Sequence, residues 1–271
     1  MFLSDYHVHT HLSPDGENSF LDMASAAAER GISRLCFTDH VDDCCAADPL
    51  SYEAGSFERI NSGIPEYLEA ADRLRDRIDI RRGIELGSPN HMPERASDIC
   101  SDSRLDFIIG SVHNLRGMDD FYFLDYPDLE TCRELSVRYL DEYLEIAKMG
   151  CCDVLGHIGY TNRYMADKGF YVDFTDYGDR LTALFQTIIG KGTGIEVNTS
   201  SLRGSLGEPN PSLPLLKLYL ELGGEIITTG SDAHRVCDAG ADIPRVTTML
   251  AELGYKYVCV FKERKPEFVK L

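Results

Sequence analysis

Short apolar segments alternate along the chain with longer segments in which apolar residues recur every three to four positions. The short segments are rich in β-branched and aromatic residues and have the length of buried strands. They predict strands at residues 2–9, 34–39, 78–86, 106–113, 153–157, 194–198 and 225–231. A late run at 255–261 is either an eighth strand or an addition to the edge of the sheet.

The longer segments have the periodicity of amphipathic helices. After Ser19, an N-cap residue, the apolar positions of residues 20–28 form one stripe, and Gly31 ends the helix. A second helix is predicted over residues 129–149, and a third stripe ends before Gly190. Strands that alternate with helices predict a parallel sheet with helices outside it.

Such a sheet is either open and doubly wound or closed into a barrel. Polar residues follow the carboxyl end of nearly every predicted strand, where a TIM-type barrel gathers its active site. An open sheet concentrates such residues at one switch point instead. We therefore predict a distorted (β/α)7 TIM-like barrel that forms a single α/β domain over residues 1–271, a length that suits one domain.

Composition narrows the class of protein. Hydrophobic residues make up 43% of the chain, enough for a full core, and no apolar run has the length of a membrane span. The sequence lacks a signal peptide at its start and a C-x-x-C pair among its nine cysteines, so we expect a cytoplasmic protein with reduced thiols. The net charge of −18 disfavours binding to nucleic acid, although bound cations would allow a small anion to bind.

Six of the eight histidines fall in or directly after predicted strands. His7 and His9 are two residues apart on the first strand, so both imidazoles point to one face, about 6.6 Å apart along the chain. Asp232 and His234 repeat this spacing after a later strand, and Glu85 ends another. A single histidine at a strand end is more often structural, but six of them with carboxylates predict a site for Zn²⁺, Mn²⁺ or Fe²⁺.

The candidate ligands divide into two sets. Six of them complete a binuclear site, which by itself also fits a C–N hydrolase of the amidohydrolase type: His7, His9, Glu85, His113, His157 and Asp232. Asp15, His40 and His234 remain as a further triad of nitrogen and oxygen ligands, which implies a third metal. Since three cations can clamp several phosphoryl oxygens, this surplus favours phosphate-ester chemistry.

The motifs that contain these ligands resemble those of the polymerase-and-histidinol-phosphatase (PHP) superfamily of metal-dependent phosphoesterases. They occur in the expected order: His7-Val8-His9-Thr10, Thr38-Asp39-His40, Gly83-Ile84-Glu85, Ser111-Val112-His113, Gly156-His157 and Ser231-Asp232-Ala233-His234. The resemblance implies a distorted barrel with three divalent ions, held by His7, His9, Glu85 and Asp232, by Glu85, His113 and His157, and by Asp15, His40 and His234. Asp15 stands where some branches use histidine, which weakens any preference of the third site for a soft metal.

Within the superfamily, the chain most resembles the histidinol-phosphate phosphatases. The likeness rests on residues 106–115, 120–122 and 196–203. It implies hydrolysis of L-histidinol phosphate to L-histidinol and phosphate in histidine biosynthesis. The alternatives are a PHP phosphoesterase acting on nucleotides, nucleic-acid ends or phosphoprotein, the C–N hydrolase, and a non-enzymatic metal-binding protein with a relic site.

The predicted reaction is attack on phosphorus by a metal-bridging hydroxide. Glu85 would bridge two ions, and Asp232 and His234 would act with it as catalytic ligands. Arg203 and Arg163 would bind the phosphate, since guanidinium groups can hold it bidentately. For Arg163, a role in a surface salt bridge is nearly as well supported as a role in phosphate binding.

Other polar residues near the motifs are predicted to have supporting roles. Glu196 and Asn198 are expected to form hydrogen bonds to the ligands. His11 and His91 are assigned to loops. The acidic stretch at 39–48 is expected to be a solvated loop, which could also cover the site as a lid.

Overall fold

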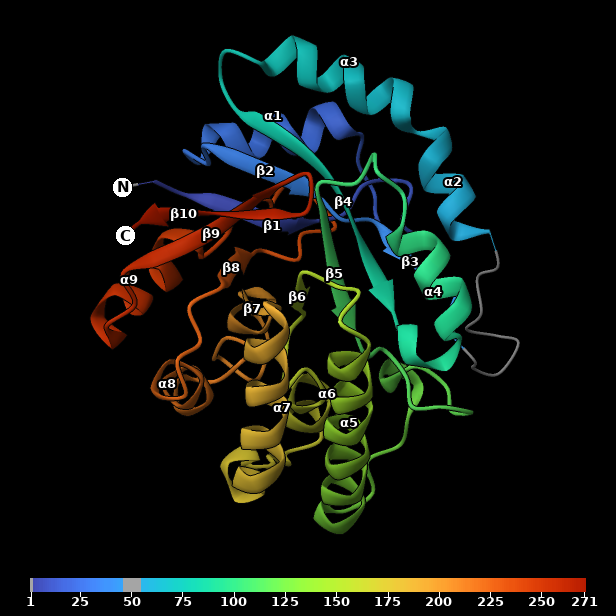
Figure 1. The fold of residues 1–271 in the computed structure, drawn as a ribbon, viewed down its shortest axis with the longest axis vertical. Coiled ribbons are helices and arrows are strands. Elements are labelled where there is room, and N and C mark those ends of the chain that lie inside the picture. Colours follow the sequence, from blue (N-terminus) through green and yellow to red (C-terminus); the bar gives the residue numbers. More distant parts are fainter. Residues whose placement is uncertain (1, 46–54) are drawn as a thin grey trace.

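The computed structural model describes residues 2–45 and 55–271, and its centre is a set of parallel strands surrounded by helices (Figure 1). The strands neighbour one another in chain order: β1 (Ser4–Val8), β2 (Arg34–Phe37), β4 (Asp79–Gly87), β5 (Phe107–Ser111), β6 (Val154–Leu155), β7 (Gly194–Asn198) and β8 (Ile227–Gly230). A two-residue strand that the sequence did not predict, β3 (His40–Val41), pairs with β4. The predicted α/β barrel with seven strands on its path is confirmed.

Strand β1 also meets β8, so the barrel is nearly closed. The backbone N–H of Asp232 donates to the carbonyl of His7 at 2.8 Å, and the N–H of His9 donates to the carbonyl of Ala233 at 2.9 Å. These bonds place the first and last motifs of the chain side by side at the carboxyl ends of the strands. Figure 1 shows the two chain termini close together on the same side of the molecule.

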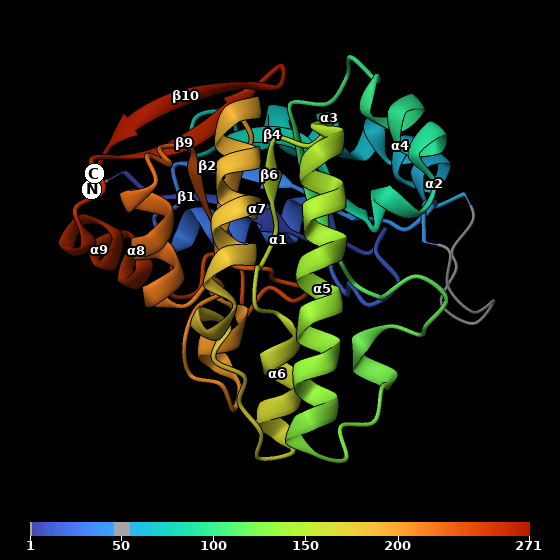
Figure 2. The ribbon, with the colours of Figure 1, turned by 60° about the horizontal axis from the view of Figure 1, so that its bottom comes forward.

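The helices cover the outside of the barrel, as Figures 1 and 2 show. They are α1 (Phe20–Glu29), α2 (Ser56–Ser62), α3 (Ile64–Leu74), α4 (Pro93–Cys100), α5 (Leu129–Met149), α6 (Thr161–Asp167), α7 (Gly178–Lys191), α8 (Leu213–Glu221) and α9 (Ile243–Leu253). Short 3₁₀ helices occur at Pro89–His91, Phe121–Phe123, Phe174–Tyr177 and Ser200–Arg203. Helix α5 has the predicted bounds, because the Asp128 carboxylate accepts the Thr131 N–H at 2.8 Å at one end and Gly150 is left-handed at the other.

The late run forms a hairpin outside the barrel. Strand β9 (Tyr257–Lys262) pairs antiparallel with β10 (Lys265–Lys270), a strand that the sequence did not predict. The Phe261 carbonyl of β9 accepts a hydrogen bond from the Tyr6 hydroxyl at 3.0 Å. Phe261 also packs with Tyr6 and Phe107 in a second, smaller apolar core. The run is therefore not an eighth barrel strand.

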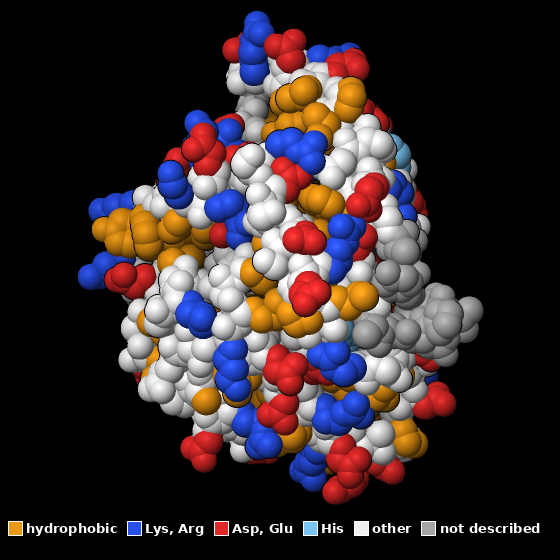
Figure 3. All heavy atoms as spheres, turned by 45° about the vertical axis from the view of Figure 1, so that its right-hand side comes forward, with side chains coloured by type: hydrophobic (Ala, Val, Ile, Leu, Met, Phe, Trp, Pro, Cys, Tyr) orange, Lys and Arg blue, Asp and Glu red, His pale blue; other side chains and the backbone are white. Residues whose placement is uncertain are grey.

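The surface carries charges of both signs, and the cysteines are free thiols. On the face drawn in Figure 3, the described Lys and Arg side chains are interspersed with Asp and Glu and form no continuous basic patch. All nine cysteines are free, and most are buried: Cys36, Cys44, Cys45, Cys132, Cys152 and Cys259. Among the described helices, none combines the length and the apolar character that crossing a bilayer requires.

Candidate metal centre

The nine predicted ligand residues lie together at the carboxyl end of the barrel. Each comes from the end of a strand or from the loop that follows one, as a TIM-type barrel would arrange them. Glu85 lies in β4, and the parallel register of β3 and β4 pairs His40 with it directly. Apart from Asp15, which is 62% exposed, these side chains are buried or half-buried.

One oxygen of the central Glu85 faces two imidazoles. Its Oε1 lies 3.0 Å from Nε2 of His113 and 2.8 Å from Nε2 of His157. The Ser111 hydroxyl donates to the same oxygen at 2.7 Å. These three residues come from β5 and from the segments after β5 and β6, so neighbouring strands of the barrel converge on one carboxylate oxygen.

The other oxygen of Glu85 faces a different group of imidazoles. Its Oε2 lies 3.2 Å from Nε2 of His7, 3.6 Å from Nε2 of His9 and 2.9 Å from Nδ1 of His40. Oδ1 of Asp232 lies 3.6 Å from His7 Nε2 and 3.4 Å from His9 Nε2. Asp232 adopts a left-handed backbone with φ of 54°, unusual for a non-glycine residue and typical of a functional position.

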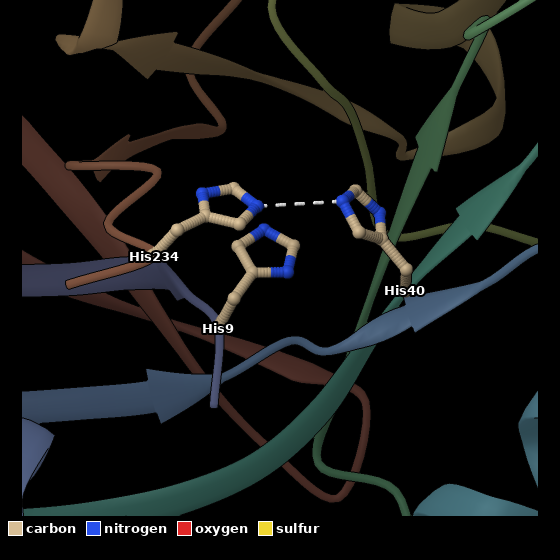
Figure 4. A group of neighbouring side chains, drawn as sticks. All are labelled: His9, His40 and His234. Atoms are coloured by element: carbon tan, nitrogen blue, oxygen red, sulfur yellow. Dashed lines mark hydrogen bonds between the residues drawn. The ribbon is translucent and has the colours of Figure 1, made fainter. Parts of the chain in front are cut away.

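A third group lies beside this one, nearer the solvent. Nε2 of His40 lies 3.4 Å from Nε2 of His234 and 3.6 Å from Oδ1 of Asp15, and His234 Nε2 lies 3.2 Å from the other Asp15 oxygen. Figure 4 shows that the ring of His9 lies against this group, and its centroid is 4.0 Å from that of His234. His9 therefore stands between the two groups, whereas the sequence assigned it to one of them.

Several buried polar atoms at the centre have no hydrogen-bond partner in the described part of the chain. They are His7 Nε2, His9 Nε2, His40 Nδ1 and Glu85 Oε2, and they all face the same space. Buried polar atoms are nearly always satisfied, so such a group requires another explanation. Ligands of a divalent ion at 2.0–2.2 Å lie about 3.0–3.4 Å apart, close to the separations observed here. The donor set therefore fits divalent cations bound by imidazole and carboxylate.

The surroundings of His7 and His9 shift the pKa values of these two histidines in opposite directions. Burial lowers the pKa of His7, but Glu196, Glu85 and Asp232 together raise it well above its usual value. Burial and the neighbouring His234 and His40 instead lower the pKa of His9. Without cations, protons must therefore balance the buried carboxylates. Bound metal ions would replace those protons, since imidazole coordinates a metal only in its neutral form.

Glu196 and Asn198 support the ligands as predicted. Oε1 of Glu196 lies 2.7 Å from Nδ1 of His7, and its Oε2 accepts the backbone N–H of His157 at 2.9 Å. Asn198 Nδ2 donates to Asp232 at 3.2 Å. The contact with Glu196 favours a proton on Nδ1 of His7 and leaves its Nε2 free to coordinate a cation.

The acidic stretch at 39–48 was predicted to be a solvated loop. Its described residues, 39–45, are not solvated in this way, and residues 46–48 lie outside the described part of the chain. The buried carboxylate of Asp39 accepts hydrogen bonds from the Thr10 N–H at 2.6 Å and from the Ser13 hydroxyl at 2.8 Å. The Ser13 oxygen in turn lies 3.0 Å from Nδ1 of His9. Asp39 thus fixes a loop that orients His9, one of the predicted ligands.

Sequence reasoning missed Asp42 in the same stretch. Its Oδ1 lies 3.4 Å from Nδ1 of His113, and Asp42, His40 and His113 form a further group able to hold a metal ion. A Cβ atom at Gly87 would lie 2.1 Å from this carboxylate oxygen, so glycine leaves the space that Asp42 occupies. The sequence signal was present as an acidic residue two positions after His40, the same spacing as in the other motifs.

The two predicted phosphate-binding arginines differ in their contacts. Arg203 is held by its neighbours, since its Nη2 donates to the Ser231 carbonyl at 2.8 Å and its Nε lies 3.2 Å from Asp238. Arg163 is half-buried in α6, with its guanidinium carbon 6.0 Å from the ring centre of Tyr164. Burial lowers its pKa, while nearby groups that include Asp232 raise it overall. Arg163 therefore lies within electrostatic reach of the centre.

His11 and His91 lie outside the cluster of ligands. The imidazole of His11 is 42% exposed and lies 3.4 Å from Glu66. His91 is buried, with Nε2 3.2 Å from Oε2 of Glu142. Both lie apart from the ligand cluster, as expected, but His91 ends the 3₁₀ helix Pro89–His91 and does not lie in a loop.

The chain is similar to known proteins over nearly its whole length. A family model described as the PHP domain matches residues 5–200. A histidinol-phosphatase of Lactococcus lactis is 26% identical, with 96% of this chain and 95% of that protein covered. A probable histidinol-phosphatase of Thermotoga maritima is 25% identical, with 94% of each covered. The crystal structure of a Lactococcus lactis histidinol phosphate phosphatase complexed with zinc, L-histidinol and phosphate matches with a TM-score of 0.79 at 23% identity, covering 98% of each chain.

Proposed function

We propose, since the chain belongs to the PHP domain family, that it is a metal-dependent phosphatase that hydrolyses L-histidinol phosphate to L-histidinol and phosphate. The histidinol-phosphatase of Lactococcus lactis and the probable one of Thermotoga maritima are covered over 95% and 94% of their lengths, which supports this assignment. The observation that carries the proposal is the third ligand group beside Glu85, because two groups alone would also serve a C–N hydrolase.

Three divalent ions, of Zn, Mn or Fe, are proposed for the centre. Glu85 would bridge the first two, with His7, His9 and Asp232 on one side and His113 and His157 on the other. Asp15, His40 and His234 would hold the third. The two Glu85 oxygens face different histidines, Oε2 facing His7 and Oε1 facing His113, and this supports the grouping. The buried atoms around Oε2 that lack a hydrogen bond support it as well.

When bound, such ions lower the pKa of a water molecule to supply a nucleophile near neutral pH, and they neutralise the phosphate. The residues of the chain would hold these ions in fixed geometry. Glu85 and Asp232 supply negative charge at the centre, while His234 would help to hold the third ion. Arg163 would orient the phosphate, and Arg203 would have to exchange its present contacts to do so.

A row of tyrosine rings beside the metal centre favours a substrate that contains a flat ring. The ring of Tyr160 lies 4.5 Å from that of His157, Tyr164 lies 5.1 Å from Tyr160, and Tyr122 lies 5.9 Å from Tyr164. These rings lead from the metal centre outward to Tyr122, which is 68% exposed. The imidazole of histidinol phosphate could stack on such a surface, at a gain of about 0.5–1.5 kcal/mol for each pair of rings.

The test replaces Glu85 or His157 with alanine and measures turnover of histidinol phosphate after reconstitution with Mn²⁺ or Zn²⁺. We expect both variants to lose nearly all turnover, while His11→Ala, a matched control outside the cluster, keeps it. Full turnover in Glu85→Ala would refute the assignment. A wild type that hydrolyses other phosphate esters better than histidinol phosphate would refute the substrate but not the chemistry.

Elemental analysis separates this proposal from a C–N hydrolase. Three Mn²⁺ ions per chain would support the phosphatase centre. Two or fewer ions, together with hydrolysis of a C–N bond and of no phosphate ester, would favour the amidohydrolase type.

A further inference from the structure

Three cysteine thiols gather at the opposite end of the barrel from the metal centre. Cys100 ends α4, and Cys151 and Cys152 lie at the amino end of β6, separated from it by Asp153. The three sulfur atoms all lie within 4.8 Å of one another, and those of Cys151 and Cys152 are 3.8 Å apart. None of the three forms a disulfide.

The fold holds the backbone of this cluster in place. Arg264, in the turn of the β9–β10 hairpin, donates from Nη1 to the Cys100 carbonyl at 3.1 Å and from Nη2 to the Cys151 carbonyl at 2.7 Å. The remaining nitrogen, Nε, donates to Asp153. A Cβ atom at Gly110 would lie 2.7 Å from the Cys152 sulfur, so glycine leaves room for that thiol. One guanidinium thus joins segments that are about fifty residues apart in the sequence.

The arrangement has the features of a site for a thiophilic cation. In a tetrahedral zinc site with Zn–S bonds of 2.3 Å, sulfur atoms lie about 3.8 Å apart, which the Cys151–Cys152 pair already matches. Cys152 is buried, whereas Cys100 and Cys151 are half-buried, so two of the three thiols are partly exposed to solvent. The guanidinium of Arg264 beside the thiols would offset part of the negative charge of three thiolates.

We propose that Cys100, Cys151 and Cys152 form a binding site for a soft divalent cation such as Zn²⁺ or Cd²⁺, separate from the centre at the barrel mouth. Binding would release the thiol protons and leave water as the fourth ligand. Because thiolate ligands select soft metals, this site would differ in preference from the imidazole and carboxylate centre.

The thiols also influence one another's protonation. Hydrogen bonds with Cys100 and Cys152 lower the pKa of Cys151, while hydrogen bonds with Cys100 and Cys151 raise the pKa of Cys152 well above its usual value. The thiolate is the form of cysteine that binds a metal.

The experiment titrates the reduced protein with Cd²⁺ and follows the ultraviolet thiolate-to-cadmium charge-transfer band. Cadmium bound by imidazole and carboxylate lacks this band, so the readout is independent of the barrel-mouth centre and of phosphatase activity. We expect the band of the wild type to level off at the amplitude of one thiolate-bound Cd²⁺ per chain, and to be lost in Cys100→Ser and in Cys151→Ser. Cys237→Ser, a control at an exposed cysteine, should keep it.

Two results would overturn the proposal. One is a band of unchanged amplitude in both Cys100→Ser and Cys151→Ser, which would place the thiolates elsewhere. The other is no band in the wild type. A count of nine reactive thiols in the unfolded protein would show that the sample was fully reduced, so the missing band would then mean that the cluster does not bind the cation.

Discussion

Replacement of Glu196 by glutamine tests how the centre holds its histidines without touching a proposed ligand. Glu196 is buried, and its two oxygens face two donors, with Oε1 2.7 Å from His7 Nδ1 and Oε2 2.9 Å from the His157 backbone nitrogen. Glutamine keeps the size of the side chain but has only one acceptor oxygen. Its NH₂ group must therefore face either the His7 ring or the His157 N–H, and one donor then meets another donor.

The expected decrease in metal affinity follows from the loss of this acceptor oxygen. Removing a carboxylate that orients a metal-binding histidine typically weakens metal affinity by about 10- to 100-fold, which corresponds to about 1.4–2.7 kcal/mol. If the glutamine NH₂ group faces the His7 ring, the ring loses its acceptor at Nδ1 and is no longer held with Nε2 toward Glu85. We therefore expect the dissociation constant of the metal ion bound by His7 to rise by that factor in Glu196→Gln. Turnover at limiting metal should fall in proportion and recover largely when the metal is in excess.

The assay is competition for Mn²⁺ or Zn²⁺ against a chelating indicator, with metal content measured after dialysis. Glu142→Gln is the matched control, because Oε2 of Glu142 lies 3.2 Å from Nε2 of His91, a carboxylate–histidine contact outside the centre. An unchanged metal affinity in Glu196→Gln would refute the reasoning. So would an equal loss in Glu142→Gln, since the effect would then not depend on the contact with His7.

Three further predictions concern the third ion, the phosphate and the pH dependence of stability. Asp15→Ala should lower the Mn²⁺ content of the chain from three ions to two without changing the melting temperature of the metal-free protein, because Asp15 is 62% exposed; a Mn²⁺ content still at three would contradict its role. Arg163→Ala should raise KM for phosphate esters more than Arg203→Ala does, since Arg203 is already held by other groups, and steady-state kinetics showing the reverse order would contradict this. Burial raises the pKa of Asp5 from 3.8 to about 6, so the folded protein keeps a proton there that the unfolded chain loses. The stability of the wild type relative to Asp5→Asn should therefore be highest below about pH 4 and fall by up to ~3 kcal/mol as the pH rises to about 6, as measured by denaturant unfolding with chelator present. A pH-independent difference would contradict it.

The regular elements were predictable where the local signal was strong. Helix α5 (Leu129–Met149) and strand β7 (Gly194–Asn198) have the bounds that the sequence predicted, because caps and glycines mark their ends. Strand β10 (Lys265–Lys270) was missed because its residues are mostly exposed and charged, and its pairing with β9 depends on a turn through Arg264 with positive φ. Periodicity also could not tell whether the run that became β9 would join the barrel or cover one end of it.

The sequence by itself determined which residues could meet at the barrel mouth. In a parallel barrel every strand ends at the same side, so the positions of His7, Glu85 and Asp232 at strand ends were enough to predict a common site. Only the tertiary structure decided how these side chains divide around the two oxygens of Glu85 and that His9 stands between two groups. It also decided that Asp42 reaches His113 and that Cys100 reaches the pair at 151–152. These outcomes depend on the register of neighbouring strands and the closure of β1 on β8, which are long-range contacts that no local pattern encodes.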